Sequence, residues 1–161
     1  MDIAKLIAKH SLISDQITPI ELTVVLTELV KVLAHKVPGD VVEFGCFNGT
    51  TSLYLRRLLD LYEQQRGFHV YDSFEGLPPK SSADVNAAGA SFQGGELAVS
   101  KRQFLSAFQR AGLRPPIVHK AWFKDLQASD VPDTIAFAFL DGDFYESILQ
   151  SLQLVWPRME Q

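Results

Sequence analysis

The sequence predicts an α/β protein with a doubly wound parallel sheet in the strand order 3-2-1-4. Apolar runs of strand length alternate with amphipathic helical segments, as in repeated strand, helix and strand units. One run, residues 135–140, is apolar on both faces, as in a parallel strand covered by helices on each side. Residues 40–51, D-V-V-E-F-G-C-F-N-G-T-T, pass from an apolar strand through a glycine turn into a helix. Open α/β sheets bind ligands at such turns.

Length and charge restrict the function. The 161 residues suffice for one domain with its own core. A net charge of -4 provides no basic surface for nucleic acid or an anionic membrane, so we expect neither partner. No apolar run reaches the roughly 20 residues of a membrane span. The single cysteine, Cys46, excludes an internal disulfide and fits the reducing cytoplasm, where we expect the protein.

The chain is expected to form one structural unit with two parts, an N-terminal helical extension of residues 1–37 and an α/β domain of residues 38–161. Within the extension, the apolar spacing in residues 1–13 predicts a short amphipathic helix. A capping box of Thr18 and Glu21 then begins a longer helix. The apolar stripe of this helix is formed by Leu22, Val25, Leu26, Leu29 and Leu33.

The first strand, residues 41–44, leads into a helix that Asn48 or Thr50 is expected to cap. Arg56 and Arg57 lie between the apolar positions of this helix and should be solvated. Its buried stripe is predicted to consist of Leu55, Leu58, Leu59 and Tyr62.

A second strand, residues 68–71, ends at Asp72, 27 positions after Gly45 (72 minus 45). A carboxylate at that place is suited to accept hydrogen bonds from ribose hydroxyls. Glu43, Gly45, Gly49 and Asp72 therefore form one candidate cofactor site. In the alternative interpretation, Glu43 accepts hydrogen bonds from turn amides, and the two glycines only allow strand and helix to pack closely.

The glycine turn narrows the class of cofactor. It departs from the G-x-G-x-x-G dinucleotide motif because position 47 is Phe, and it lacks the Gly-Lys-Ser/Thr of a phosphate-binding loop. Acidic residues at the ends of two strands suit a cofactor with a ribose and a cationic or zwitterionic tail. S-adenosylmethionine has that chemistry, whereas a nicotinamide or flavin dinucleotide is disfavoured.

Residues 73–95 show no periodicity, and a connection of that length is usually a lid or disordered. Residues 73–79 at its start, which include Ser73 and Phe74, should be ordered close to the cofactor end of the sheet. A helix is predicted over residues 96–111 and a third strand at 117–119.

Four further residues have both functional and structural interpretations. Trp122, after the third strand, either covers an adenine face or packs in the core. His69 and His119 lie in strands, where histidines are more often structural residues than bases. A helix N-terminus lowers the pKa of a thiol, but no histidine is spaced to make Cys46 a nucleophile, so we expect it to pack.

The fourth strand, residues 135–140, delivers Asp141 and Asp143 to the same carboxyl edge of the sheet. Asp143 and Glu146 have the D-x-x-E spacing of a helix cap, so Asp143 is more readily a cap than a ligand. Asp141, at the tip of a buried strand, is the better candidate for an oxygen ligand to Mg²⁺. The helix that follows should bury Tyr145, Ile148, Leu149, Leu152 and Val155.

Four segments together resemble the macrocin O-methyltransferase (TylF-type) family. They are V-P-G-D-V-V-E-F-G-C-F-N-G-T-T-S, Y-D-S-F-E-G-L-P, A-W-F-K-D-L and F-L-D-G-D-F-Y-E-S, in the family's order and spacing over roughly residues 36–158. The resemblance implies a Rossmann-like class I methyltransferase sheet. It also implies an enzyme that uses S-adenosylmethionine and Mg²⁺ to methylate a hydroxyl of a sugar or natural-product-like small molecule.

The resemblance also implies roles for individual residues. Glu43, Gly45 and Gly49 would hold the methionine end of the cofactor, and Asp72 would bind its ribose, with Ser73 and Phe74 alongside. Asp141 would act in catalysis as a metal ligand, with Asp143 as the second candidate ligand. The remaining candidate cofactor-binding residues are Phe44, Asn48, Thr50, Thr51 and Trp122.

The chain departs from the family after its last helix. Family members continue into a fifth strand with a further acidic pair that completes the metal site, whereas this chain stops at Gln161. One copy therefore cannot supply a complete metal site, and the strand at 135–140 is expected to keep an apolar edge that favours a homodimer. The alternative interpretation is a C-terminally truncated, non-catalytic remnant that binds cofactor weakly or not at all.

Overall fold

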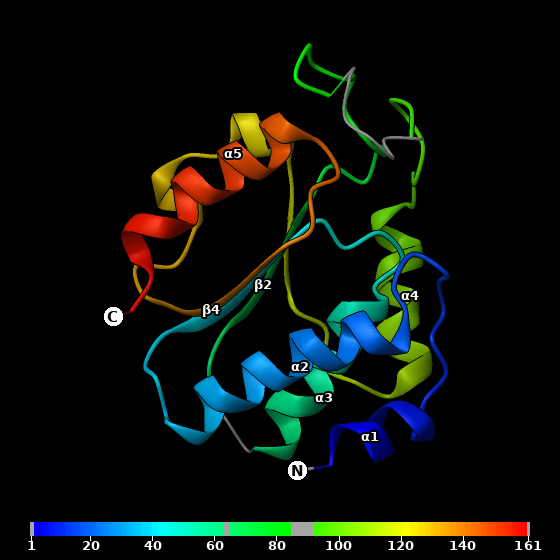
Figure 1. Ribbon diagram of the computed structural model, residues 1–161, viewed down its shortest axis with the longest axis vertical. Helices are drawn as coiled ribbons and strands as arrows, with labels where there is room; N and C mark the ends of the chain where they lie inside the picture. The colour runs from blue at the N-terminus through cyan, green and yellow to red at the C-terminus, as the bar shows by residue number, and fades with distance from the viewer. Residues whose placement is uncertain (1, 63–64, 85–91, 161) are drawn as a thin grey trace.

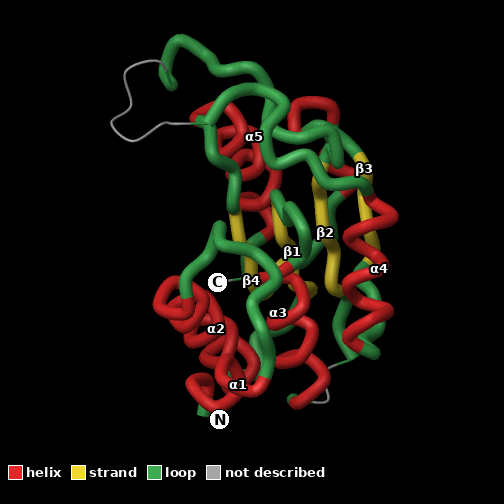
Figure 2. The backbone as a smooth tube through the Cα atoms, turned by 90° about the vertical axis from the view of Figure 1, so that its right-hand side faces the viewer, coloured by secondary structure: helices red, strands yellow, loops and turns green. Residues whose placement is uncertain are grey.

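The computed structural model describes residues 2–62, 65–84 and 92–160, which form a four-stranded parallel sheet. Its strands lie in the order β3-β2-β1-β4 (Figure 2), so the predicted order is confirmed. Each predicted strand agrees with the observed one to within one residue at either end. The strands are β1 (Asp40–Phe44), β2 (Phe68–Asp72), β3 (Ile117–Lys120) and β4 (Ile135–Leu140).

Helices cover both faces of the sheet (Figure 1). One face carries α2 (Pro19–Ala34), α3 (Thr50–Leu61) and α4 (Lys101–Ala111), with α1 (Ile3–Lys9) packed on α2, and the other carries α5 (Tyr145–Val155). Successive residues of β1 point to opposite faces. Val41 belongs to the larger core under α2 to α4, whereas Val42 and Phe44 belong to the smaller core on the α5 side.

The helix ends follow local sequence signals. α2 begins with the predicted capping box, in which the Glu21 N–H donates to the Thr18 hydroxyl and the Glu21 carboxylate accepts from the Thr18 N–H. α4 begins at residue 101, later than predicted, because Ser100 and Gln103 form a second capping box. Within the described ranges, no helix is both long and apolar enough to cross a membrane.

α3 is buried more completely than predicted, because it lies between the sheet, α2 and α4. Arg56 is only 2% exposed, so the expectation that it is solvated is wrong. Its guanidinium pairs with Asp60, one turn later, at 2.6 Å, which gives the buried charge a partner. The guanidinium of half-buried Arg57 lies over the Tyr54 ring, 5.1 Å from the ring centroid.

α5 packs on the sheet with a different side than predicted. Its buried residues are Ser147, Ser151 and Val155. Of the predicted stripe, only Val155 is buried and Leu149 is half-buried, whereas the expectation is wrong for Tyr145, Ile148 and Leu152, which are exposed. The two serines are small, and the Ser151 hydroxyl is satisfied within the helix by the Ser147 carbonyl at 2.9 Å.

β4 is an outer strand of the sheet, with β1 on its inner side. On its outer side, Met159 forms a single parallel bridge to Ile135, and the Glu160 N–H donates to the Ile135 carbonyl at 3.0 Å. Past Ile135, the described parts of the chain place no strand beside β4. Most of β4 therefore keeps the open edge that the sequence predicted.

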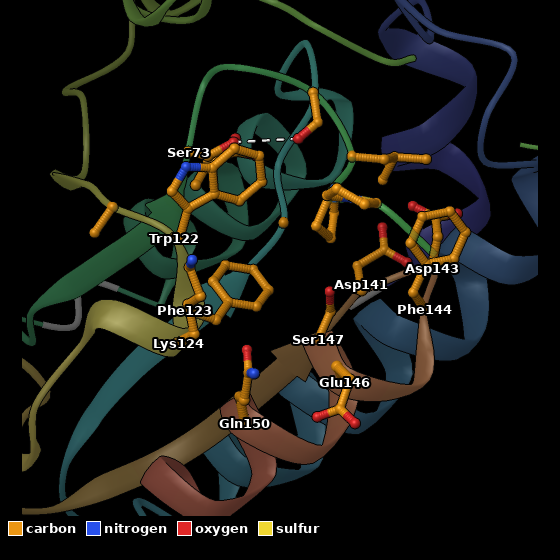
Figure 3. A pocket seen from close by; sticks show the side chains of 18 of the residues that line it. Ser73, Trp122, Phe123, Lys124, Asp141, Asp143, Phe144, Glu146, Ser147 and Gln150 are labelled. Atoms are coloured by element: carbon orange, nitrogen blue, oxygen red, sulfur yellow. Dashed lines mark hydrogen bonds between the residues drawn. The ribbon is translucent and has the colours of Figure 1, made fainter. Parts of the chain in front are cut away.

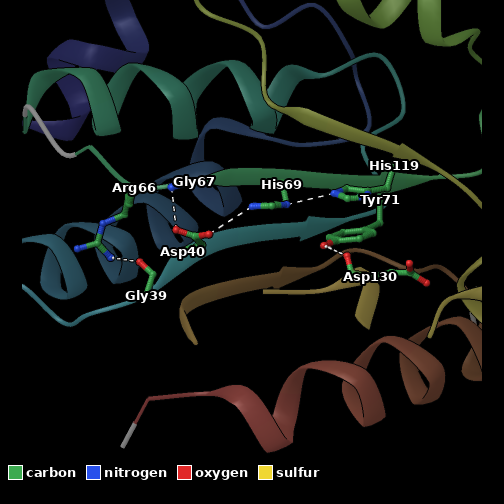
Figure 4. Close-up of polar contacts among 8 residues, drawn as sticks. All are labelled: Gly39, Asp40, Arg66, Gly67, His69, Tyr71, His119 and Asp130. Atoms are coloured by element: carbon green, nitrogen blue, oxygen red, sulfur yellow. Dashed lines mark hydrogen bonds and ion pairs between the residues drawn. The ribbon is translucent and has the colours of Figure 1, made fainter. Parts of the chain in front are cut away.

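A row of polar side chains crosses the sheet on its α5 side (Figure 4). The Asp40 carboxylate lies 3.3 Å from His69 Nε2, and His69 Nδ1 lies 3.1 Å from His119 Nε2. The His119 ring stacks on Tyr71, whose hydroxyl donates to the Asp130 carbonyl at 2.8 Å. Both histidines therefore have structural partners, as predicted.

Candidate active site

The carboxyl ends of β1, β2 and β4 and the segment after β3 enclose a pocket of about 320 Å³ (Figure 3). Its wall combines the glycine turn, the acidic residues that follow two strands, a loop and the first turns of α5. The lining residues are Gly45, Asp72, Ser73, Gly76, Leu77, Pro78, Pro79, Asp84, Ala121, Trp122, Phe123, Lys124, Asp141, Gly142, Asp143, Phe144, Glu146, Ser147 and Gln150. The pocket lies at the edge of the sheet where the sequence predicted a cofactor.

Gly45 is where the turn after β1 meets the turn after β4. Its φ is +86°, and a Cβ atom there would lie 2.5 Å from the carbonyl oxygen of Asp141. The Asp141 N–H donates to the Phe44 carbonyl at 2.8 Å, and the Gly45 N–H donates to the Tyr71 carbonyl at 2.9 Å. Only glycine fits this backbone and this close approach. The ends of β1, β2 and β4 are thereby joined into one rigid rim.

Asp72 connects the two turns at the centre of this rim. Its Oδ2 accepts from the Cys46 N–H at 2.9 Å, and its Oδ1 accepts from the Phe74 N–H at 2.7 Å. The Cys46 thiol also contacts Oδ2, at 3.4 Å, and the residue is buried, so Cys46 packs as expected. Each carboxylate oxygen can accept more than one hydrogen bond. Asp72 therefore retains acceptor capacity on the pocket side.

Glu43 lies behind the pocket wall, outside the residues that line it. Its carboxyl accepts from the Ser52 hydroxyl at 2.5 Å, which joins β1 to α3. Burial raises the pKa of Glu43 well above its ordinary value, the Ser52 bond opposes this, and Asp141 and Asp72 add to the rise. The structure thus places Glu43 as a support for the turn.

Other candidate residues of the first turn also lie outside the pocket lining. The Asn48 amide donates to the Ile13 carbonyl at 2.7 Å, and its oxygen accepts from the Thr50 N–H at 3.3 Å. Gly49 is the N-cap of α3 and packs against Phe104. Thr51 is buried in α3. These residues fix how α3 and the N-terminal segment meet the turn.

Aromatic residues form the side of the pocket that belongs to β2 and β3. Trp122, Phe123 and Ser73 all line the pocket, and Ser73 lies beside Trp122 at the end of β2 (Figure 3). Phe123 packs edge-on against Phe44, with ring centroids 5.2 Å apart. Phe74 turns away into the larger core. Trp122 is therefore placed to face a ligand, whereas Phe44 supports the wall from below.

Asp141 and Asp143 bring negative charge to the opposite side of the pocket (Figure 3). Burial, followed by the charges of Asp143 and Glu21, raises the pKa of Asp141 to about 6. Burial also raises the pKa of Asp143. The D-x-x-E spacing predicted that Asp143 would be the N-cap of α5. This prediction is wrong, because the N-cap is Phe144. Within the described residues, no group of three or more His, Cys, Asp or Glu side chains could hold a metal ion.

Sequence reasoning placed the start of the loop after β2, residues 73–79, close to the cofactor end of the sheet, where Gly76, Leu77, Pro78 and Pro79 line the pocket. It missed two other parts of the wall. One is Asp84, farther along the same loop. The predicted loop also includes residues 85–91, which lie outside the described residues. The other part is the start of α5, with Glu146, Ser147 and Gln150. The polar positions of α5 at i, i+1 and i+4 were the available signal for that face.

Sequence comparisons find three curated relatives of this chain. A Streptomyces olivaceus protein, 8-demethyl-8-(2,3-dimethoxy-alpha-L-rhamnosyl)-tetracenomycin-C 4'-O-methyltransferase, is 37% identical over 80% of this chain and 51% of its own length. Demethyldecarbamoylnovobiocin O-methyltransferase of Streptomyces niveus is 31% identical over 80% and 51%. Mycinamicin III 3''-O-methyltransferase of Micromonospora griseorubida is 30% identical over 79% and 53%. The chain thus spans about half the length of these relatives.

Two solved structures of methyltransferases are also similar to this chain. The O-methyltransferase NovP superimposes with a TM-score of 0.75 and 29% identity, over 86% of this chain and 60% of its own. The calicheamicin methyltransferase CalS11 has a TM-score of 0.66 at 19% identity, over 97% and 71%, which supports the fold alone. The family described as Macrocin-O-methyltransferase (TylF) matches residues 21–161. The chain belongs to this O-methyltransferase family.

Proposed function

We propose that this chain binds S-adenosylmethionine and takes part in methyl transfer to a hydroxyl of a sugar or natural-product-like small molecule. The observation that carries the proposal is the convergence of Gly45, Asp72, Trp122 and Asp141 on one pocket at the carboxyl edge of the sheet. The acceptor class is supported by the relatives, which are named as O-methyltransferases of a rhamnosyl-tetracenomycin, of demethyldecarbamoylnovobiocin and of mycinamicin III.

The residues present fit S-adenosylmethionine. The Gly45 turn leaves open backbone where a side chain would otherwise fill the pocket rim. Asp72 can accept from ribose hydroxyls, and Trp122 offers an aromatic face to a flat base. Asp141 and Asp143 supply negative charge for a cationic group. The same two acids would repel the pyrophosphate of a dinucleotide.

The proposed chemistry is a direct displacement. When bound, S-adenosylmethionine supplies a methyl group on a positively charged sulfur, so that the C–O bond to the acceptor forms as the C–S bond breaks. The chain orients the two reactants by holding one of them along the fixed rim of strand ends. Asp141 lines the same rim, and its carboxylate faces the pocket in which the hydroxyl would react.

Mg²⁺ fits the described residues only in part. Asp141 and Asp143 are two carboxylates, and the described ranges bring no third metal-binding side chain to them. Mg²⁺ in proteins prefers octahedral oxygen coordination. We therefore propose that Asp141, with Asp143 beside it, would contact the ion.

Transfer of a labelled methyl group tests the proposal. The chain is incubated with S-adenosylmethionine carrying a tritiated methyl group and a panel of glycosylated hydroxyl acceptors, with and without Mg²⁺. We expect label on an acceptor, its loss in Asp72→Ala, and no change in the exposed control Asp133→Ala. Cofactor that binds but never yields labelled acceptor would remove the catalytic half of the proposal.

A further inference from the structure

The N-terminus of α5 is capped by a residue from a distant part of the chain. The Tyr145 N–H, in the first turn of α5, donates to Asp84 Oδ1 at 2.8 Å, across 61 positions of sequence. The N-cap residue itself is Phe144, whose side chain has no hydrogen-bonding group. A helix start leaves unpaired N–H groups with a partial positive charge. Asp84 satisfies one of these groups with a carboxylate.

Asp84 is fixed in place from its own side as well. The residue is 5% exposed, and its Oδ2 accepts from the Ser81 N–H at 2.8 Å and from the Ser81 hydroxyl at 2.7 Å. The bond from the Tyr145 N–H and those from Ser81 hold the pKa of Asp84 below its ordinary value. Asp84 is therefore a charged group with both oxygens engaged.

The loop that carries Asp84 is a wall of the pocket. Its two sides are joined where the Leu77 N–H donates to the Glu96 carbonyl at 2.9 Å and the Gly95 N–H donates to the Leu77 carbonyl at 2.8 Å. Leu77 lines the pocket together with Pro78, Pro79 and Asp84. The bond from Asp84 to α5 therefore connects two parts of the pocket wall that are far apart in the sequence.

The local sequence favours Asp143 as the residue that caps α5. Asp143 and Glu146 have the capping spacing, yet in the described chain Asp143 lines the pocket beside Asp141. As the N-cap, Asp143 would accept from the Glu146 N–H, and Phe144 would have to be helical. Instead Phe144 is extended, with φ -115° and ψ 152°, and Asp84 accepts from the Tyr145 N–H. The two carboxylates thus correspond to two alternative starts of one helix, and the start that Asp84 bonds is the one observed.

We propose that Asp84 is a positioning residue: by capping α5 in place of Asp143, it keeps the Asp143 carboxylate turned into the pocket. Without Asp84, Asp143 caps α5 and its charge leaves the ligand side. Which of the two carboxylates caps α5 does not depend on any activity. Only the role of Asp143 in contacting a ligand rests on the proposed function.

A double-mutant cycle in urea unfolding tests this competition. In the wild-type background, Asp143→Ala should change the unfolding equilibrium constant less than about twofold. In the Asp84→Ala background, Asp143→Ala should raise it roughly fivefold, because it then removes a helix cap. The same effect in both backgrounds would overturn the proposal, because Asp143 would not have moved.

Conservative variants separate positioning from a general loss of loop structure. Asp84→Asn keeps an acceptor oxygen, so Asp143→Ala should be nearly silent in that background, as it is in the wild type. If Asp84→Ala does not fold, amide hydrogen exchange in Ser81→Ala replaces it, since this variant removes one bond that holds Asp84. Exchange should then quicken at the Tyr145 N–H and slow at the Glu146 N–H.

Faster exchange at Tyr145 with unchanged exchange at Glu146 in Ser81→Ala would refute the proposal, because Asp143 would not have reached the helix start. None of these measurements depends on methyl transfer. Failure of this inference can therefore be told apart from failure of the proposed function.

Discussion

Gly45 shows how one residue controls the pocket rim. We expect Gly45→Ala to displace Asp141, whose carbonyl oxygen would lie 2.5 Å from the new methyl group, and to weaken S-adenosylhomocysteine binding by roughly tenfold or more. Gly95→Ala is the matched control, because Gly95 has a similar φ of +84° but a Cβ atom there would meet nothing within 4 Å. Calorimetry measures both. Equal losses of affinity in the two variants would mean that backbone strain causes the effect, and would contradict the proposed clash with Asp141.

Glu43 predicts a specific dependence of stability on pH. Its pKa in the folded chain is raised well above the ordinary value of 4.5, so above pH 4.5 the unfolded chain loses a proton that the folded chain keeps. The stability contributed by Glu43 is therefore present below pH 4.5 and is lost as pH rises towards the folded pKa.

The isosteric variant Glu43→Gln cannot ionise, so its stability relative to the wild type should increase from pH 4 to pH 8. Urea unfolding at several pH values measures the difference. Asp133→Asn, at an exposed position, is the control for the replacement of a carboxylate by an amide. A constant offset for Glu43→Gln across this range would mean that Glu43 ionises normally in the folded chain.

At the level of residues, sequence reasoning succeeded where strand ends meet and failed where a distant loop intervenes. Gly45, Asp72 and Asp141 could be placed together, because parallel strands deliver the residues that follow them to one edge. The cap of α5 could not, because the local spacing favoured Asp143 and the bond from Asp84 spans 61 positions. Arg56 was misplaced because α3 is enclosed on nearly every side.

Among the elements, the strands were the most predictable part of the fold. Short apolar runs between turn residues gave all four spans and, with right-handed crossovers, the order of the sheet. The orientation of α5 was not predictable from its periodicity. The sheet packs against the face with Ser147, Ser151 and Val155, and not against the predicted apolar stripe, because small residues permit close packing.

The orientation of α5 can be tested by two truncations on opposite sides of the helix. Val155 is 2% exposed, so Val155→Ala should destabilise the chain by about 2 kcal/mol. Leu152 is 42% exposed, so Leu152→Ala should cost less than about 0.7 kcal/mol. Urea unfolding measures both values. The reverse ranking would show that the predicted stripe, and not the observed one, faces the sheet.

On the scale of the whole molecule, apolar surface gathers near the open edge of β4. α5 exposes Tyr145, Leu152 and, just after its end, Trp156, which is 74% exposed. Unpaired strand edges and apolar patches favour association. We therefore propose that the chain self-associates through this side, and we expect light scattering to show mass increasing with concentration.

Trp156→Lys should shift this association towards the monomer. Ile117→Lys is the control, because Ile117 is exposed on β3, at the opposite edge of the sheet. A single mass equal to that of one chain at every concentration would contradict association, and equal effects of the two variants would contradict its assignment to the β4 side.

The proposed function depends on a pocket that forms within a chain that spans about half the length of its curated relatives. Its most direct test is a calorimetric titration of the folded chain with S-adenosylhomocysteine, compared with Asp72→Ala and the exposed control Asp133→Ala. We predict binding at a single site in the wild type and in Asp133→Ala, and at least tenfold weaker binding in Asp72→Ala. Absence of binding to the folded wild-type chain, or equal affinity in Asp72→Ala, would contradict the proposal.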